Sequence, residues 1–203
     1  MIESIRDLIH READAIRNIP VGENYEKALS VIHQRVHVQG GKLITSGMGK
    51  AGLIARNMAT TFCSTGTPAV FLHPSEAQHG DLGVLSKNDV LLLVSNSGKT
   101  REILELIELT GKLFPDLPII AITGNQRGTI AKRASACLHT GAPTEVCPLG
   151  LTPTTSTTVM TVIGDVLVVE MMKRIGFTRA DYAKRHHGGY LGHVSRKLSE
   201  TNE

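Results

Sequence analysis

Apolar and polar residues alternate along the chain in blocks that predict buried strands and helices in turn. Mainly apolar segments, typical of strands buried on both faces, lie at 42–46, 69–72, 89–94 and 118–123. A fifth candidate strand is ASACLH, residues 134–139. Helical spacing follows the first run and resumes after residues 100 and 127. This pattern predicts an α/β, doubly wound, mainly five-stranded parallel sheet of the flavodoxin-like type, with ligands at the carboxyl ends of its strands.

The two ends of the chain are predicted to be helical. Two N-terminal helices, residues 2–18 and 23–38, are separated by the break at Pro20–Gly22. A long helix over about 154–174 follows the last strand. We interpret residues 1–203 as a single domain with three parts: a helical N-terminal extension (1–38), the sheet core with the long helix (39–175) and a C-terminal helical segment (176–203).

The long helix is apolar on nearly every face, which permits two interpretations. Asp165, Glu170 and Lys173, with the Thr/Ser cluster at 154–158, interrupt the apolar length that a membrane span requires. In a soluble protein, a helix that is apolar all round is buried in a core or in a subunit interface. We therefore predict no membrane association and a homo-oligomer in which part of this helix lies between subunits.

Length and cysteine content narrow the class of protein. With 203 residues, 41% of them hydrophobic, the chain can build one sizeable core. Its three cysteines lack C-x-x-C spacing, which argues for a reducing compartment and against disulfides or a zinc knuckle, so we interpret them as packing residues. The charged N-terminus lacks the apolar core of a secretory signal. We therefore expect a cytoplasmic protein.

The charge and aromatic content bear on the ligand. The net charge is +3, but the chain has no Trp, only 3% aromatic residues and no dense Lys/Arg run. The stacking platforms and basic stripes of nucleic-acid binders are therefore missing. A small phosphorylated substrate fits this composition better than a polynucleotide does.

VSNSGKTREI, residues 94–103, connects a predicted strand to a predicted helix. The nucleotide P-loop pattern requires a glycine five residues before Gly98, and Leu93 stands there, so that interpretation fails. A helix N-terminus with hydroxyl side chains nearby is a general anion site. The alternative is ordinary capping of the helix by Ser97 or Thr100.

SGMGKAG, residues 46–52, follows the first strand and places Lys50 among three glycines. Gly47, Gly49 and Gly52 fit the dinucleotide fingerprint G-x-G-x-x-G. The acidic residue that binds ribose in such folds is expected about twenty positions later. No Asp or Glu ends the second strand before Glu76, so the dinucleotide interpretation is disfavoured.

HPSEAQHGDLG, residues 73–83, gathers titratable groups between strands. His73 and His79 are a weak metal signal, because their spacing lacks a cysteine or a third ligand. We interpret His73 as a hydrogen-bonded histidine that shapes the turn. His79 is the better functional candidate.

Five segments together resemble the sugar isomerase (SIS) domain of arabinose 5-phosphate isomerases. They are SGMGKAG, HPSEAQHGDLG, SNSGKT followed by Arg101-Glu102, CPLGLTPTTSTT and KRHHGGYLG. The resemblance spans nearly the whole chain. Many members carry a C-terminal pair of CBS domains, which the sequence ending at Glu203 does not include, so we expect the form without them.

The resemblance implies an isomerase that interconverts D-ribulose 5-phosphate and D-arabinose 5-phosphate and feeds 3-deoxy-D-manno-octulosonate biosynthesis for lipopolysaccharide or capsule. It implies active-site roles for Lys50, His79, Glu102 and His186, with the histidines open to contribution by a neighbouring subunit. The pattern His-x-x-G-x-LG selects His186 over His187, although the family commonly has proline at the second position. The residues implied to hold the substrate phosphate are Ser46, Ser95, Asn96, Ser97 and Thr100.

The residue types suit aldose–ketose isomerisation, which moves a proton next to a carbonyl through an enediolate. We assign the carbon acid/base to Glu102, with His186 as the other candidate, and electrostatic stabilisation to Lys50. Imidazoles at His79 and His186 can move protons between oxygens near neutral pH. Glu102 can equally be an acid favoured by a helix N-terminus. This chemistry requires no cofactor, and we expect no metal.

Two other functions share these features. One is another SIS phosphosugar isomerase, for sedoheptulose 7-phosphate or hexulose 6-phosphate, against which the HGDLG loop argues. The other is a non-catalytic module that senses a sugar phosphate, as in transcriptional regulators. The expected partners are further copies of the chain, in a tetramer, and an anionic pathway end product that inhibits at the sugar-phosphate site.

Overall fold

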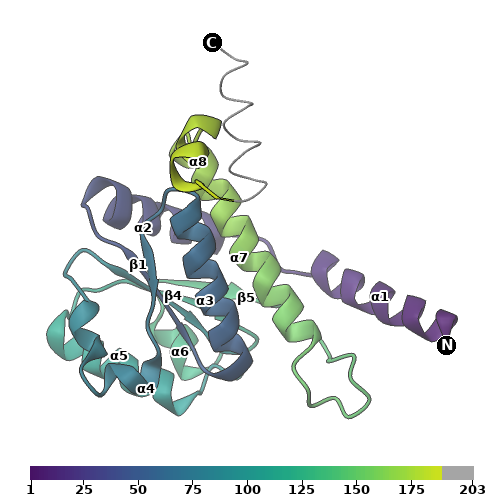
Figure 1. Ribbon diagram of the computed structural model, residues 1–203. Helices are drawn as coiled ribbons and strands as arrows, with labels where there is room; N and C mark the ends of the chain where they lie inside the picture. The colour runs from purple at the N-terminus through teal and green to yellow at the C-terminus, as the bar shows by residue number, and fades with distance from the viewer. Residues whose placement is uncertain (189–203) are drawn as a thin grey trace.

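The computed structural model describes residues 1–188 and contains one five-stranded parallel sheet (Figure 1). The strand order is β2-β1-β3-β4-β5, and every neighbouring pair is parallel. The doubly wound prediction is therefore confirmed, including the fifth strand. The strands are β1 (Leu43–Gly47), β2 (Ala69–Phe71), β3 (Val90–Val94), β4 (Ile119–Thr123) and β5 (Ala136–His139).

Helices connect the strands and extend both ends of the described chain. They are α1 (Ile2–Arg17), α2 (Glu23–Ile32), α3 (Gly49–Ser64), α4 (Pro74–Ala77), α5 (Arg101–Leu113), α6 (Thr129–Arg133), α7 (Thr155–Arg174) and α8 (Arg179–Arg185). The helix predicted over 23–38 is α2 continued by a π-helix, His33–Val38. A 3₁₀ turn, Asp81–Val84, follows α4.

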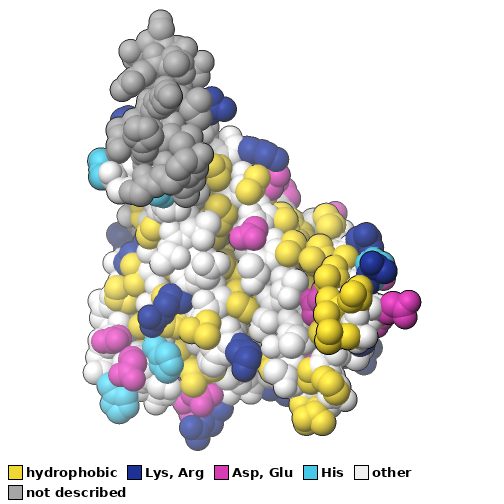
Figure 2. Space-filling model, turned by 45° about the vertical axis from the view of Figure 1, so that its right-hand side comes forward, with side chains coloured by type: hydrophobic (Ala, Val, Ile, Leu, Met, Phe, Trp, Pro, Cys, Tyr) yellow, Lys and Arg dark blue, Asp and Glu magenta, His cyan; other side chains and the backbone are white. Residues whose placement is uncertain are grey.

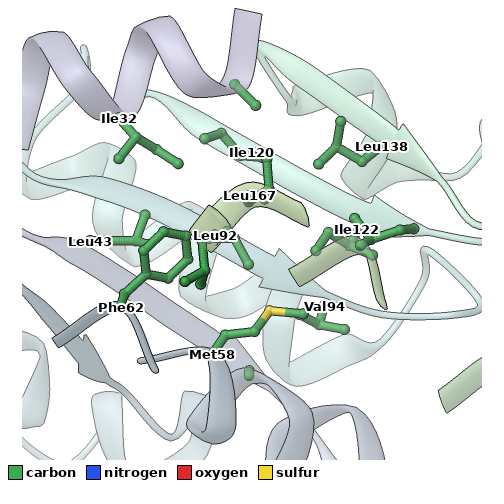
Figure 3. Close-up of a cluster of buried hydrophobic side chains, with 14 of the residues drawn as sticks. Ile32, Leu43, Met58, Phe62, Leu92, Val94, Ile120, Ile122, Leu138 and Leu167 are labelled. Atoms are coloured by element: carbon green, nitrogen blue, oxygen red, sulfur yellow. The ribbon is translucent and has the colours of Figure 1, made fainter. Parts of the chain in front are cut away.

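Alternate side chains of the strands pack on opposite faces of the sheet. Leu43, Leu92 and Ile120 lie in the cluster formed with α2, α3 and α7, which Figure 3 shows in part. Ile44 and Leu91, their neighbours in sequence, lie in the other cluster, with α5 and α6. Because successive strand side chains point to opposite faces, a sheet covered on both sides requires apolar residues at every position.

Helix α7 lies against α3 and the sheet, with its apolar residues only partly enclosed. By length and composition it is apolar enough to cross a membrane, but half of its most apolar 18-residue window is buried within the domain. Core helices of soluble proteins share this property. Packing, rather than the charges noted in the sequence, therefore assigns α7 to the core. Val166 and Val169 remain exposed on its outer side.

Helix α1 projects from the body of the molecule (Figure 1) and buries none of its residues. Its C-terminal half is tied to α7 by a hydrogen bond of 2.8 Å from Thr155 Oγ1 to Glu12 Oε1. Hydrophobic side chains gather on the side from which α1 projects (Figure 2). The exposed apolar residues of α1 are Ile2, Ile5, Leu8 and Ile9, next to Met1.

All three cysteines are free, as their spacing predicts, but only one acts as a packing residue. Cys137 packs against the apolar cluster below α5. Cys63 is exposed, and its thiol donates to Ala69 O at 2.9 Å. The Cys147 sulfur accepts hydrogen bonds from the amides of Leu151 and Thr152. Cys63, in the last turn of α3, and Cys147 therefore bind backbone groups, which corrects the expectation that all three cysteines are packing residues.

Candidate active site

A pocket of about 350 Å³ lies at the carboxyl ends of β1 and β3. The chain leaves β1 toward β2 on one side and β3 begins on the other side, so the strand order reverses here. Such switch points are where open α/β sheets bind ligands. The residues lining the pocket are Met48, Lys50, Ala51, Val94, Ser95, Asn96, Ser97, Thr100, Pro153, Ser156, Thr157 and Met160.

The turn between β3 and α5 forms one wall of this pocket. Thr100 is the N-cap residue of α5, but within residues 1–188 its side chain makes no capping hydrogen bond to the helix. The Thr100 hydroxyl instead lies 2.8 Å from Ser95 Oγ, and Ser97 Oγ accepts from the Lys99 amide at 3.2 Å. Simple capping by Ser97 or Thr100 is therefore not what these hydroxyls do. Amides at a helix N-terminus that lack a side-chain cap are a general site for anions.

Glycine at position 98 permits this turn. Its φ is +63°, a left-handed value that strains other residues, and an added Cβ would lie 3.1 Å from Thr123 Oγ1. The turn is further held by hydrogen bonds from the Gly98 amide to Ser95 O and from Asn125 Nδ2 to Ser97 O. These hydrogen bonds fix the backbone that carries the Ser95, Ser97 and Thr100 hydroxyl groups.

The glycines of SGMGKAG bring α3 close to the end of β1. A Cβ on Gly52 would lie 2.5 Å from Gly47 O, and one on Gly47 would lie 2.9 Å from Ala51 C. The two residues therefore have to be glycine for the strand and the helix to meet. This contact places Lys50 in the first turn of α3, where it lines the pocket.

Ser46 does not join the other predicted phosphate ligands. It is fully buried, and its hydroxyl donates to Leu72 O at 2.6 Å. That bond links β1 to the residue that follows β2. In the structure the Ser46 hydroxyl thus supports the strand ends, whereas Ser95, Asn96, Ser97 and Thr100 line the pocket.

Glu145 shapes the opposite wall of the pocket, and motif analysis did not single it out. Its carboxylate accepts from the Thr154 amide at 2.7 Å and from the Ser156 amide at 3.2 Å, and also from the Ser156 hydroxyl. Burial raises the pKa of this carboxyl, but these hydrogen bonds outweigh burial and hold it below its ordinary value. The Glu145 carboxylate therefore caps the N-terminus of α7, a role that a side chain at the N-cap position usually has. The one sequence signal was an isolated acid in a segment of Pro, Gly and Thr.

Glu102 and His79 are not among the residues that line the pocket in the described part of the chain. Glu102 is half-buried in the first turn of α5, two residues beyond Thr100. His79 is exposed in the loop after α4. A hydrogen bond of 2.8 Å from Gln78 Nε2 to Glu105 Oε2 ties that loop to α5. Both residues are thus carried by segments that meet at α5.

His186 directly follows α8, which lies at the far end of α7 from the pocket (Figure 1). Its ring stacks on Tyr182, with centroids 3.7 Å apart, and Nδ1 lies 3.0 Å from Tyr182 O. Helix α7 separates α8 from the pocket, and its 20 residues span about 30 Å. The motif that selected His186 continues through residues 189–192, which lie outside the described residues. Within one chain, His186 does not reach Lys50.

The His-rich loop forms no ligand cluster in the part of the chain that the structure describes. Within residues 1–188, the buried His73 Nδ1 has no hydrogen-bond partner, which differs from the expectation of a hydrogen-bonded turn histidine. Its ring packs edge-on to Phe71 instead, with centroids 6.3 Å apart. Within residues 1–188, no three His, Cys, Asp or Glu side chains are grouped as metal ligands.

The sheet has the flavodoxin-like strand order, and a hydroxyl-rich turn lies at its switch point, which is where α/β domains of this class bind ligands. The chain belongs to the SIS domain family, whose pattern matches residues 38–170.

Three relatives illustrate the similarity. Arabinose 5-phosphate isomerase KdsD of Francisella tularensis is 45% identical over 178 residues, which are 88% of this chain and 53% of the relative. A crystal structure from Bacteroides fragilis, described as a candidate phosphosugar isomerase involved in capsule formation, has a TM-score of 0.92 and 65% identity, covering 94% of this chain and 99% of that one. Escherichia coli CFT073 c3406, in complex with arabinose 5-phosphate, has a TM-score of 0.84 and 36% identity, covering 91% and 96%.

The similarity to the curated relatives is limited in extent. This chain spans about half the length of the curated relatives that it matches. The similarity to the two solved structures instead runs over nearly their full length.

Proposed function

We propose that this protein interconverts D-ribulose 5-phosphate and D-arabinose 5-phosphate and supplies 3-deoxy-D-manno-octulosonate biosynthesis, for lipopolysaccharide or capsule. The observation that carries the proposal is the switch-point pocket, in which Lys50 faces the hydroxyl turn of β3 and α5. The names of the similar proteins, KdsD and the arabinose 5-phosphate complex among them, support this substrate.

The substrate phosphate is assigned to the turn that ends β3. Ser95, Asn96, Ser97 and Thr100 line the pocket there, at the N-terminus of α5. Free amides and the helix dipole favour a dianion at this position. Lys50, on the opposite side of the switch point, is placed to stabilise the negative charge of an enediolate or of the phosphate.

Proton transfer is assigned to Glu102. It follows the phosphate turn directly, so a substrate held by its phosphate at Thr100 extends past the first turn of α5. A carboxylate there can remove the proton next to the carbonyl and return it to the neighbouring carbon. His79 and His186 are assigned to ring opening and to proton movement between oxygens.

The active site is proposed to be shared between subunits of a homotetramer. His186 lies beyond the far end of α7 from its own pocket, so its role requires the pocket of another copy. The exposed apolar residues of α1 and α7 are surfaces that an oligomer would cover. His79, exposed on its loop, is also accessible to a neighbouring subunit.

Two further properties belong to the proposal. The reaction uses side chains alone, so activity should persist in EDTA. An anionic end product of the pathway is proposed to inhibit by occupying the sugar-phosphate pocket, in competition with substrate. We place the protein in the cytoplasm, where such phosphorylated intermediates are made.

Incubation of the purified protein with D-ribulose 5-phosphate tests the function. NMR should identify D-arabinose 5-phosphate as the aldose formed, and Lys50→Ala should abolish its formation. Turnover of sedoheptulose 7-phosphate or hexulose 6-phosphate instead would indicate another SIS isomerase. Tight binding of the sugar phosphate without turnover would indicate a sensing module.

A further inference from the structure

A second hollow, of about 670 Å³, lies on the outer side of α3 and against the edge strand β2. It is separate from the switch-point pocket, with which it shares no lining residue. Its floor is neutral, made of small and apolar side chains. The lining residues are Arg56, Ala59, Thr60, Cys63, Ser64, Ala69, Val70, Phe71 and Arg185.

Two arginines from distant parts of the chain face this hollow. Arg56 projects from α3, and its guanidinium carbon lies 4.9 Å from the centroid of the Phe71 ring in β2. Arg185, at the end of α8, lies over the Phe177 ring at 5.3 Å. Phe177 packs so tightly on Gly66 that a Cβ there would approach its ring to 2.8 Å. A cation–π contact thus holds each guanidinium group beside an aromatic ring.

Neither arginine is neutralised within the described chain. No Asp or Glu of residues 1–188 lines the hollow, and none forms a salt bridge with either guanidinium. Arg185 donates one hydrogen bond, to Asp181 O at 3.0 Å. The Asp181 carboxylate is already engaged with the Thr178 hydroxyl and with Lys184. Two positive charges therefore share one hollow without a counter-ion from the described residues.

The other polar side chains of the hollow donate their protons to the backbone. Thr60 donates to Asn57 O at 2.8 Å, and Ser64 donates to Thr61 O at 2.9 Å. The Cys63 thiol donates to Ala69 O. Among residues 1–188, the donors of the lining that remain for a ligand are therefore the Arg56 guanidinium and the N–H groups that Arg185 does not donate to Asp181 O. Their planar N–H groups match the geometry of phosphate and carboxylate oxygens.

We propose that this hollow is a second oxyanion site, which binds a phosphate group between Arg56 and Arg185. The phosphate belongs either to inorganic phosphate or to a small phosphate monoester, whose carbon part would rest on Val70 and Ala59. The site does not depend on the proposed isomerase activity, since binding there requires no turnover.

Equilibrium dialysis with radiolabelled inorganic phosphate tests the proposal. Wild-type protein should bind two phosphates per chain. Ser97→Ala should weaken phosphate binding at the switch-point pocket. The double variant Arg56→Gln with Arg185→Gln should weaken phosphate binding in the second hollow by about tenfold or more, because the loss of one hydrogen bond to a charged group lowers affinity by that factor. The double variant Arg56→Lys with Arg185→Lys keeps the positive charges but loses the planar guanidinium groups. Its affinity for phosphate should lie between those of the wild type and the double glutamine variant. Circular dichroism checks that each variant is folded.

Arg179→Gln is the matched control, because it removes an exposed α8 arginine that does not line the hollow. It should leave both sites intact. Titration of the Ser97→Ala variant with ribitol 5-phosphate shows which phosphate compound the hollow binds. Tighter binding of ribitol 5-phosphate than of inorganic phosphate would indicate a phosphate monoester as the ligand. Equal binding would indicate inorganic phosphate. One phosphate per chain in the wild type, or equal losses in the Arg179 and the double variant, would overturn the proposal. Neither result would affect the isomerase assay.

Discussion

Glu145 and Ser156, 11 residues apart, are joined by two hydrogen bonds, from the Ser156 amide and from its hydroxyl to the Glu145 carboxylate. Ser156 is 1% exposed and lines the switch-point pocket. The pair therefore closes the loop before α7 onto the first turn of that helix. A charge in the loop, outside the helix, determines where one wall of the pocket lies.

Glu145→Gln should destabilise the protein, because the amide lacks the charge that caps α7. A lost cap and helix-dipole interaction amount to about 1–2 kcal/mol, measurable by urea unfolding at pH 7. Glu108→Gln, at an exposed position of α5, is the control and should change little.

The same variant should alter acid stability. The pKa of Glu145 is lowered in the folded state, because hydrogen bonding outweighs burial, so its contribution is present above the ordinary carboxyl value of 4.5. It is lost as the pH falls through the lower folded value. Wild-type stability should therefore fall more steeply below pH 4.5 than that of Glu145→Gln. Parallel curves would show that the carboxylate does not hold the helix.

Ser97→Ala should weaken substrate binding by about one to two orders of magnitude, the effect of one hydrogen bond to a charged group. Ser97 Oγ accepts from the Lys99 amide, which leaves its own proton for the phosphate, whereas one of the Ser95 and Thr100 hydroxyls donates its proton to the other. KM should rise while kcat changes less. Ser135→Ala, exposed at the opposite edge of the sheet, is the control. An unchanged KM would remove Ser97 from the phosphate site.

Glu102→Gln should depress kcat and the washout of substrate deuterium into solvent together, since the amide cannot accept the carbon proton. General-base loss typically amounts to about 10²–10⁴-fold. Substrate affinity should stay close to the wild-type value. Glu108→Gln, on the same helix, should retain full activity. If Glu102→Gln still exchanges the proton at the wild-type rate, the base lies elsewhere, and His186 becomes the leading candidate.

Co-expression of Lys50→Ala and His186→Ala chains tests whether the site is shared. Each variant alone should be inactive. Mixed oligomers should regain roughly a quarter of wild-type activity, because random pairing of two subunits makes some pockets with both residues intact. His187→Ala in place of His186→Ala should reduce activity less. Activity that never exceeds that of the separate variants would place His186 outside the partner's pocket.

Local sequence patterns were enough to predict the strands, the doubly wound class and the hydroxyl-rich turn after β3. Consecutive apolar residues such as VLLLV specify a strand buried on both faces wherever it lies in the sheet, because the backbone alternates its side chains locally. The glycine pattern around Lys50 and the hydroxyls around Gly98 are local as well. Each of these patterns depends only on residues that are close together in the sequence.

Tertiary structure decided which of the candidates share a pocket. Ser46 lies at the end of the same strand that leads to Lys50, yet its hydroxyl donates to Leu72, beside the adjacent strand. Glu145 reaches the pocket wall only because its loop folds back on α7, and His186 is separated from the pocket by the length of that helix. These distances follow from how whole elements pack, and packing depends on contacts between residues far apart in the chain, which no local pattern contains.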